Sequence, residues 1–245
     1  MSDEGVQSLL HVPRSVRHGP SPSPDGATEN VAAEWTCPED PWVSFAFAHG
    51  AGAGLRHRFM EEVTGALVAR GVAVFRYHFP YMEKLSREGT RRWGRPDPGP
   101  VLQATVRAAV ARILNDAPER PVIAGGKSMG GRMTSLSFVE TPLPGVRGIA
   151  FFGFPLHPAG KTGRTRGDHL GAVGVPMLFM QGDRDKLADS TLIAEVAGEL
   201  GARATLHVVR GADHGFEVLK RSGRTTGDVI EELADTFVAW AKKVI

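Results

Sequence analysis

Short apolar runs alternate with amphipathic stretches over most of the chain, and this alternation limits the possible folds more than any other feature. Apolar runs of strand length occupy residues 42–50, 72–79, 121–126, 146–154, 175–182 and 204–211. Segments with apolar residues at helical spacing occupy residues 56–71, 101–116, 129–140, 190–201 and 226–244. Strands that alternate with helices form a mostly parallel sheet with helices on both faces, so the sequence predicts an α/β fold. In such a sheet the functional site lies at the carboxyl ends of the strands.

The length and composition are those of one globular domain. The chain has 245 residues, of which 42% are hydrophobic, and we expect a single domain spanning residues 1–245. Residues 18–30, rich in Pro, Gly and Ser, are expected to form a loop between two early strands. The N-terminus does not have the pattern of a signal peptide, and no apolar run approaches the roughly 20 residues of a membrane helix. The single cysteine, Cys37, favours a reducing compartment, so a cytoplasmic location is expected.

One serine is surrounded by glycines where a predicted strand meets a predicted helix. The segment Gly126-Lys127-Ser128-Met129-Gly130 fits the pattern G-x-S-x-G. In that pattern the serine lies on a tight turn that exposes its hydroxyl above the sheet, and the glycines avoid collisions with neighbouring elements. A glycine-rich turn that binds nothing, or that binds a phosphate, is the alternative. The strand before and the helix after Ser128 favour a nucleophile.

A nucleophilic serine needs a base and an acid that orients the base. The turn after the strand at 175–182 offers Asp183, Asp185 and Asp189, and the turn after the strand at 204–211 offers His214. The chain order Ser128, Asp185, His214 is that of α/β-hydrolase triads. Taken singly, the aspartates could be turn residues and the histidine a structural hydrogen-bonding group. All three positions follow strands, which favours a catalytic set.

The segment 48–54, Ala-His-Gly-Ala-Gly-Ala-Gly, follows the first strongly apolar strand. Glycines at this position allow a backbone N–H to face a carbonyl oxygen as it becomes negative. We expect an oxyanion hole made by the N–H groups of Ala51 and of Met129, the residue after the serine. A flexible glycine linker is the alternative.

From about Trp42 onward the chain resembles an α/β-hydrolase. Within that superfamily it is similar to a small, largely uncharacterised group that includes a testis-expressed protein and a chromatin acetyltransferase complex subunit. The strings that carry the narrower resemblance are HGAGAG, FRYHFPYME, GRPDP, GGKSMGGRMTS, FFGFPLHPAGK and LFMQGDRD. The resemblance implies the fold and a hydrolase-like site, but it implies no substrate.

Three features distinguish the chain from the general α/β-hydrolase pattern. Lys127 precedes the serine, and the acid turn contains both Asp183 and Asp185. The usual G-x-x-D spacing, counted from Gly182, selects Asp185. No long insertion follows the strand that ends near Phe154, so we expect no large lid domain.

Basic residues follow the carboxyl ends of several predicted strands. We expect a cationic rim that attracts a carboxylate or phosphate of the substrate. The candidate substrate-binding residues are Lys127, Lys161, Arg164, Arg166, Arg91 and Arg92. Ordinary surface charge, or a docking site for an acidic partner protein, would explain the same residues.

These observations predict a serine hydrolase with the triad Ser128, His214 and Asp185, of carboxylesterase or thioesterase type, acting on a small and possibly anionic ester or thioester. The alternatives are a catalytically idle scaffold for protein interaction, or a carbon–carbon or lactone hydrolase with the same triad. The formal net charge of +2 gives no overall attraction to nucleic acid, and no membrane partner is expected. No cofactor or metal ion is expected, since the histidines lack the paired spacing of metal ligands.

Overall fold

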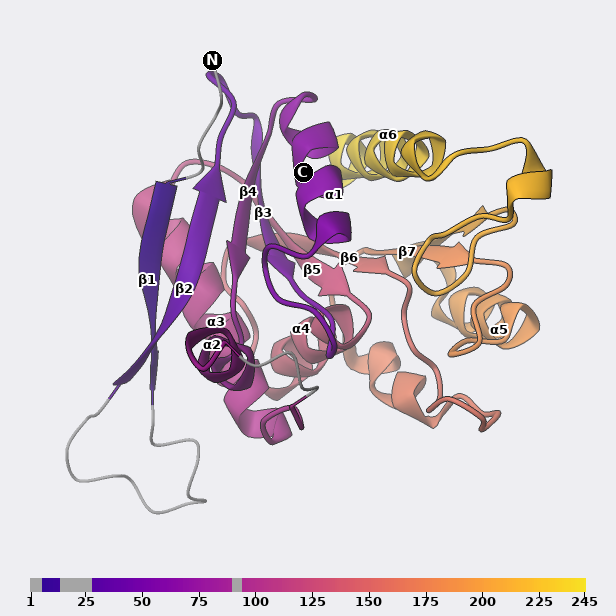
Figure 1. Ribbon diagram of the computed structural model, residues 1–245, viewed down its shortest axis with the longest axis horizontal. Coiled ribbons are helices and arrows are strands. Elements are labelled where there is room, and N and C mark those ends of the chain that lie inside the picture. Colours follow the sequence, from indigo (N-terminus) through magenta and orange to yellow (C-terminus); the bar gives the residue numbers. More distant parts are fainter. Residues whose placement is uncertain (1–5, 14–27, 90–93) are drawn as a thin grey trace.

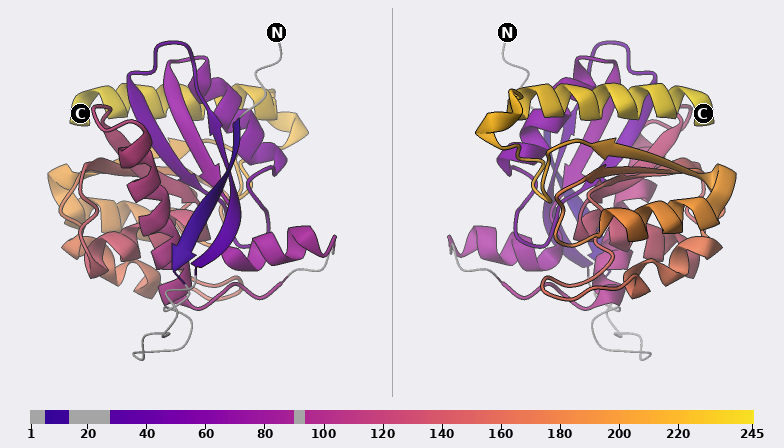
Figure 2. Two further views of the ribbon diagram at one scale, coloured as in Figure 1. Left: turned by 90° about the vertical axis from the view of Figure 1, so that its left-hand side faces the viewer. Right: turned by 90° about the vertical axis from the view of Figure 1, so that its right-hand side faces the viewer.

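A computed structural model describes residues 6–13, 28–89 and 94–245 as an α/β fold built on one sheet (Figure 1). The sheet has eight strands in the order β1-β2-β4-β3-β5-β6-β7-β8. Their bounds are β1 Val6–Pro13, β2 Thr28–Thr36, β3 Val43–Ala48, β4 Val72–Tyr77, β5 Val122–Lys127, β6 Val146–Phe152, β7 Met177–Gly182 and β8 Ala204–Val209. Strands β1 and β2 pair antiparallel, β2 is antiparallel to β4, and β3 to β8 are parallel. The two views in Figure 2 look toward the β1 edge and the β8 edge.

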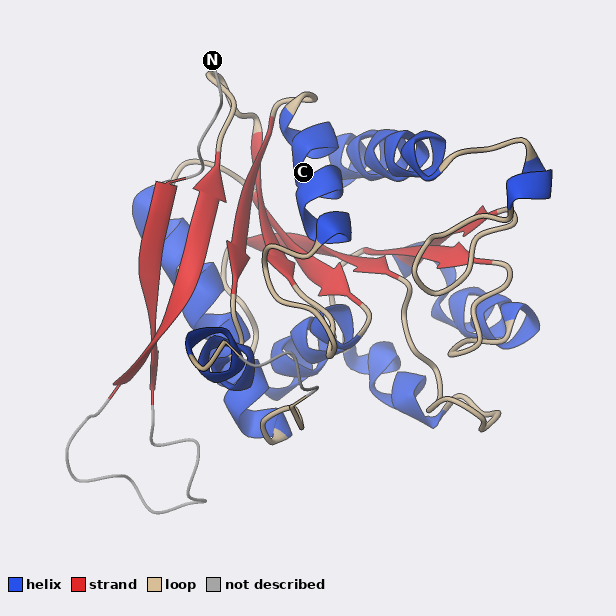
Figure 3. Ribbon diagram, in the orientation of Figure 1, coloured by secondary structure: helices blue, strands red, loops and turns tan. Residues whose placement is uncertain are grey.

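Helices cover both faces of the sheet, as Figure 3 shows. Their bounds are α1 Arg58–Val68, α2 Pro80–Arg87, α3 Gly99–Asp116, α4 Met129–Glu140, α5 Ser190–Leu200 and α6 Thr226–Val244, with the 3-10 helices η2 Thr165–Ala172, η3 Gly201–Arg203 and η4 Lys220–Ser222. Helices α1 and α6 pack on one face, and α3, α4 and α5 pack on the other. Every residue of β3, β4 and β7 is buried, which is why these strands read as continuous apolar runs.

The predicted fold class is confirmed, including the absence of a large lid domain. The connection from β6 to β7 contains only loop segments and η2. The predicted loop at residues 18–30 falls mostly on residues 14–27, which lie outside the described residues, while residues 28–30 belong to β2. Among the described helices, none is both long enough and apolar enough to cross a membrane.

Candidate active site

Ser128 lies on the sharp turn between β5 and α4. Its backbone angles, φ 50° and ψ −115°, fall in a region that residues with side chains rarely adopt, and its N–H donates to Phe152 O at 3.0 Å. The turn is tight because α4 approaches the end of β3. A Cβ on Gly126 would lie 2.4 Å from Ala48 O, and one on Gly130 would lie 2.5 Å from the same oxygen. Only glycine fits at these two positions. The two glycines therefore allow the close approach that holds Ser128 in its strained conformation.

A continuous chain of hydrogen bonds joins Asp185, His214 and Ser128. The distance from His214 Nε2 to Ser128 Oγ is 2.8 Å, and the distance from His214 Nδ1 to Asp185 Oδ2 is 2.6 Å. The carboxylate only accepts, so Nδ1 carries the proton, and Nε2 is then free to accept the serine O–H. The Asp185 side chain is 0% exposed, whereas that of His214 is 26% exposed and faces the site.

The three candidate aspartates after β7 have different roles. Asp185 accepts from Leu187 N at 2.7 Å and from Gln181 Nε2 at 2.5 Å, in addition to His214. Asp183 accepts from Gly211 N at 2.8 Å and holds the neighbouring turn. Asp189 caps α5 through Thr191 N and Leu192 N. Of the three, Asp185 is therefore the carboxylate that the structure brings to the histidine.

The surroundings of His214 lower its pKa below the ordinary histidine value, so its ring stays neutral at a lower pH. Burial is the largest cause that lowers the His214 pKa, and the positive charge of Lys127 lowers it further. The hydrogen bond and the charge of Asp185 act in the opposite direction. A neutral imidazole with Nε2 unprotonated is the form that can take a proton from a serine hydroxyl.

Lys127 is the last residue of β5, and its side chain turns toward the histidine. Its Nζ donates to the main-chain oxygen of His214 at 2.5 Å and lies 5.7 Å and 5.2 Å from the ring centroids of Phe59 and Phe216. The two rings stack on each other with centroids 5.4 Å apart. Burial lowers the pKa of Lys127 to about 8, and the charges of Asp185 and Asp213 oppose that shift. The aromatic pair forms by packing between distant segments of the chain, so it could not be predicted from the local sequence.

The loop after β3 presents a backbone N–H beside the serine. His49 Nε2 accepts from Phe79 N at 3.0 Å, so Nδ1 carries the ring proton and donates to Gly50 O at 2.7 Å. Tyr81 Oη also donates to this oxygen, at 3.4 Å, and to Ala51 O at 2.8 Å. In a trans peptide the N–H points away from the preceding carbonyl, so Ala51 N–H faces away from His49. A Cβ on Gly50 would lie 3.7 Å from Ser128 Cβ, which places this peptide next to the serine.

The conformation of the loop after β3 therefore depends on two residues whose roles were not predicted. The buried His49 ring is neutral, because burial lowers its pKa to about 3. Tyr81 reaches the loop from α2, a helix that was also not predicted. Met129, the other expected donor, is the first residue of α4, where backbone N–H groups have no acceptor within the helix.

The predicted basic residues that the structure describes have different surroundings. Arg164 makes two hydrogen bonds of 2.7 Å to Glu199 on α5, and Lys161 is exposed. Arg166 is partly buried and donates to His157 O at 3.1 Å. Arg91 and Arg92 lie outside the described residues.

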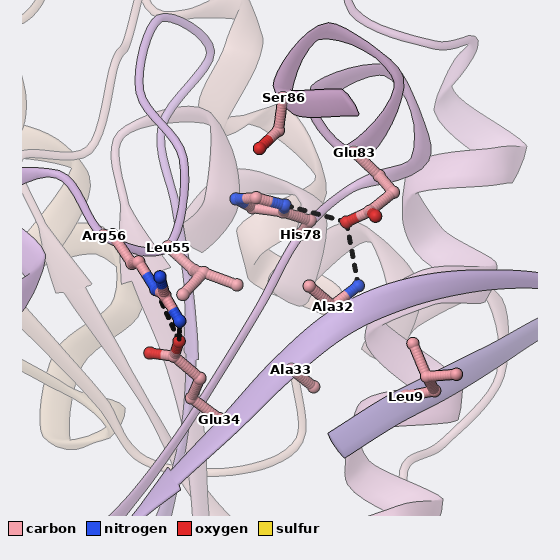
Figure 4. Close-up of a pocket in the computed structure, with 9 residues that line it drawn as sticks. All are labelled: Leu9, Ala32, Ala33, Glu34, Leu55, Arg56, His78, Glu83 and Ser86. Atoms are coloured by element: carbon pink, nitrogen blue, oxygen red, sulfur yellow. Dashed lines mark hydrogen bonds and ion pairs between the residues drawn. The ribbon is translucent and has the colours of Figure 1, made fainter. Parts of the chain in front are cut away.

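A pocket of about 480 Å³ lies beside β2 and α2 and contains no residue of the hydrogen-bonded chain (Figure 4). Its charged side chains pair with one another: Arg56 Nε lies 2.6 Å from Glu34 Oε1, and His78 Nδ1 lies 3.0 Å from Glu83 Oε2. Within the described ranges, no three His, Cys, Asp or Glu side chains group in a way that could hold a metal ion.

The parallel sheet, with a serine on its strand-to-helix turn bonded to a histidine, defines the class of α/β hydrolases. A family model described as an alpha/beta hydrolase domain matches residues 42–242, so the chain belongs to this family. The narrower resemblance to the group with a testis-expressed protein and a chromatin acetyltransferase subunit stays a prediction.

Solved structures similar to this chain include an alpha-beta serine hydrolase homologue from Coxiella burnetii, with a TM-score of 0.67 and 16% identity over 96% of this chain and 97% of that one. A serine hydrolase without a lid from Xanthomonas campestris has a TM-score of 0.65 and 19% identity, covering 98% and 96%. A dienelactone hydrolase from Anabaena variabilis ATCC 29413 has a TM-score of 0.64 and 18% identity, covering 94% and 98%. At these identities the similarity shows the fold alone.

Proposed function

We propose that this protein is a serine hydrolase that cleaves a small ester or thioester through an acyl-enzyme. Ser128 Oγ attacks the acyl carbon while His214 Nε2 takes the hydroxyl proton. Asp185 holds the imidazole in the correct tautomer and stabilises the imidazolium that forms. The N–H groups of Ala51 and Met129 donate to the oxyanion of the tetrahedral intermediate.

Collapse of that intermediate breaks the bond from the acyl carbon to the leaving oxygen or sulfur. His214 gives its proton to the leaving alcohol or thiol, and Ser128 keeps the acyl group. A water molecule then attacks the acyl-enzyme, with His214 again taking the proton, and Ser128 regains its hydroxyl proton as the acid leaves. Every proton transfer in this cycle passes through His214 Nε2, and the steps need no cofactor.

The observation that carries the proposal is the hydrogen-bonded chain from Asp185 through His214 to Ser128, with distances of 2.6 Å and 2.8 Å. The backbone of Ser128 supports it, because a residue held in such a conformation costs on the order of 1–3 kcal/mol. An idle scaffold gains nothing from a strained serine aligned with a buried acid and a neutral base.

Labelling with a fluorophosphonate probe tests the proposal. The wild type should take up one equivalent of the probe, and Ser128→Ala should take up none. Ser190→Ala, which changes an exposed serine at the start of α5, is the matched control and should label like the wild type. A wild type that is folded yet unlabelled would favour the scaffold, and label retained in Ser128→Ala would place the nucleophile elsewhere. A panel of esters, thioesters and lactones then identifies the bond that is cleaved.

A further inference from the structure

Arg132 lies on α4 one helical turn after Ser128. Its N–H donates to Ser128 O at 3.2 Å, so its backbone is fixed relative to the serine. Side chains of a helix lean toward the helix N-terminus, and Arg132 therefore leans toward the end of α4 that begins at the serine. The side chain is partly buried, and its Nε is buried without a hydrogen-bond partner in the described structure.

A second guanidinium lies near Arg132. Arg166 belongs to η2, which packs against α4, and its Nη1 donates to the main-chain oxygen of His157. Burial first, and then the charge of Arg166, lower the pKa of Arg132. The positive charge of Arg166 therefore acts on Arg132 where α4 and η2 pack together.

Neither of these guanidinium groups has a carboxylate partner within the described ranges. Several other arginines pair with an acid, whereas Arg120 and Arg203, which are also partly buried, donate to neutral oxygens. Examples of the pairs are Arg58 with Glu62, Arg70 with Glu231 and Asp235, Arg107 with Glu140, and Arg112 with Asp116. On η2 itself, Asp168 lines a different pocket together with Arg164 and Glu199, and its charge also acts on His169.

His169, which is near both arginines, adds no charge at neutral pH. Burial, and next the charge of Arg132, lower the pKa of His169 to about 4. Its Nε2 lies 2.7 Å from Ser135 Oγ, and its ring lies 6.4 Å from the ring of Phe154. The His169 side chain is therefore neutral, and the positive charge of this cluster comes from Arg132 and Arg166.

The segment that carries Arg166 is attached to the acid of the hydrogen-bonded chain. Arg166 N donates to Leu156 O at 3.3 Å, and His157 N donates to Leu187 O at 3.1 Å. Leu187 N in turn donates to Asp185 Oδ1 at 2.7 Å. Arg166 is thus held at a fixed place relative to Asp185, as Arg132 is relative to Ser128.

We propose that Arg132 and Arg166 bind an oxoanion group of the substrate, a carboxylate or a phosphate, while its ester or thioester carbon faces Ser128. Two like charges that are partly buried without an acid destabilise the fold, and a bound anion removes that cost. Guanidinium groups match both kinds of oxoanion by paired hydrogen bonds. The inference rests on the proposed function, and it narrows the substrate to one with an anionic group.

Anion binding can be measured without catalysis. The Tm of Ser128→Ala is recorded with inorganic phosphate or with propionate, against sodium chloride of equal ionic strength. We expect one or both anions to raise the Tm above the chloride value, and the better anion indicates whether the substrate group is a phosphate or a carboxylate. Adding Arg132→Gln and Arg166→Gln should remove the rise. Arg107→Gln, which changes a partly buried arginine of α3 that has an acid partner, should keep it.

Kinetics then link the anion site to the reaction. A wild type that cleaves a monoester of succinate should show a KM for this ester at least about tenfold lower than for the matched methyl-capped ester. Arg132→Gln should raise the KM of the anionic ester and leave that of the neutral ester unchanged. A Tm rise that persists in the double arginine variant, or that neither anion produces, overturns the inference. If no ester is cleaved but the anion-dependent Tm rise is present, the proposed function fails and the anion site stands.

Discussion

Lys127 Nζ lies 2.5 Å from the main-chain oxygen of His214, so the residue before the serine holds the loop that carries the histidine. Nζ also lies beside the stacked rings of Phe59 and Phe216, 5.7 Å and 5.2 Å from their centroids. The backbone of Phe216 has a positive φ of 64°, so the loop turns sharply just after the histidine. Lys127 acts on His214 both by position and by charge, and a single substitution separates this role from substrate binding.

Replacing Lys127 by Met keeps an unbranched stem beside the two rings and removes the charge and the hydrogen bond. We expect kcat to fall about tenfold, equivalent to about 1.4 kcal/mol, because His214 is held less firmly. The KM of a neutral ester should change little. Steady-state kinetics with a neutral ester measure both quantities.

The same variant should move the pH profile. The lowered pKa of His214 places the acid limb of kcat/KM in the wild type below the ordinary histidine value of about 6.5, since the enzyme loses activity as pH falls and Nε2 becomes protonated. Lys127 is charged in that range, because its own pKa is about 8. Removing the charge makes protonation of His214 easier, so the acid limb of Lys127→Met should shift upward. An identical profile in both proteins would show that Lys127 is only a packing residue.

The two neighbouring aspartates after β7 should differ strongly in their effect on activity. Asp185→Asn should lower kcat by about 10⁴-fold, because an amide favours the wrong tautomer and cannot stabilise the imidazolium. Asp183→Asn should stay within a few fold of the wild type, since an amide oxygen can still accept from Gly211 N. Single-turnover release of the alcohol from an activated ester measures both. The reverse ranking of the two variants would assign the acid to Asp183.

Tyr81→Phe tests the loop after β3 without touching the proposed reacting groups. The variant keeps the ring and loses the hydroxyl that holds Gly50 O and Ala51 O. We expect kcat to fall about tenfold with little change in KM, a smaller loss than the 10²–10³-fold effect of removing an oxyanion donor outright. In each protein, kcat is divided by the rate of fluorophosphonate labelling, and the two ratios are compared between the variant and the wild type. A loss confined to KM would place Tyr81 in substrate binding instead.

The parts of the site that could be predicted are those set by the order of strands and helices along the chain and by short spacings. Ser128, Asp185 and His214 each follow a strand, and parallel strands bring their carboxyl ends to one edge of the sheet. The spacing from Gly182 favoured Asp185 over Asp183, and the structure bonds Asp185 to His214. These features needed only the alternation of strands and helices.

The parts that the sequence did not reveal depend on contacts between distant elements. Arg164 and Arg166 are two residues apart, yet one pairs with Glu199 and the other does not, because α5 presents its acid to only one of them. The short helix α2 begins at a proline and contains three charged residues among eight, so its apolar signal is weak. Tyr81 therefore had no predicted role, although its hydroxyl donates to Gly50 O and Ala51 O in the loop after β3.

Alanine substitutions at two glycines, Gly130 and Gly65, distinguish tight packing at the serine turn from the general effect of replacing a glycine. A Cβ on Gly130 would lie 2.5 Å from Ala48 O and 2.6 Å from His49 O, and backbone oxygens of a central strand cannot move aside cheaply. Gly130→Ala should therefore lower the free energy of unfolding by about 2–3 kcal/mol, as overpacking does. It should also slow fluorophosphonate labelling, because α4 carries Ser128 and Met129 away from the loop after β3.

Gly65→Ala is the matched control. Gly65 lies in α1, is exposed, and would have nothing within 4 Å of its new Cβ. Alanine there should raise the free energy of unfolding by about 0.5–1 kcal/mol, since it reduces the freedom of the unfolded chain and suits a helix. Urea unfolding of both variants gives the two changes. Equal effects of the two substitutions would mean that α4 does not press on the end of β3 as the structure describes, and the close fit that strains Ser128 would then be absent.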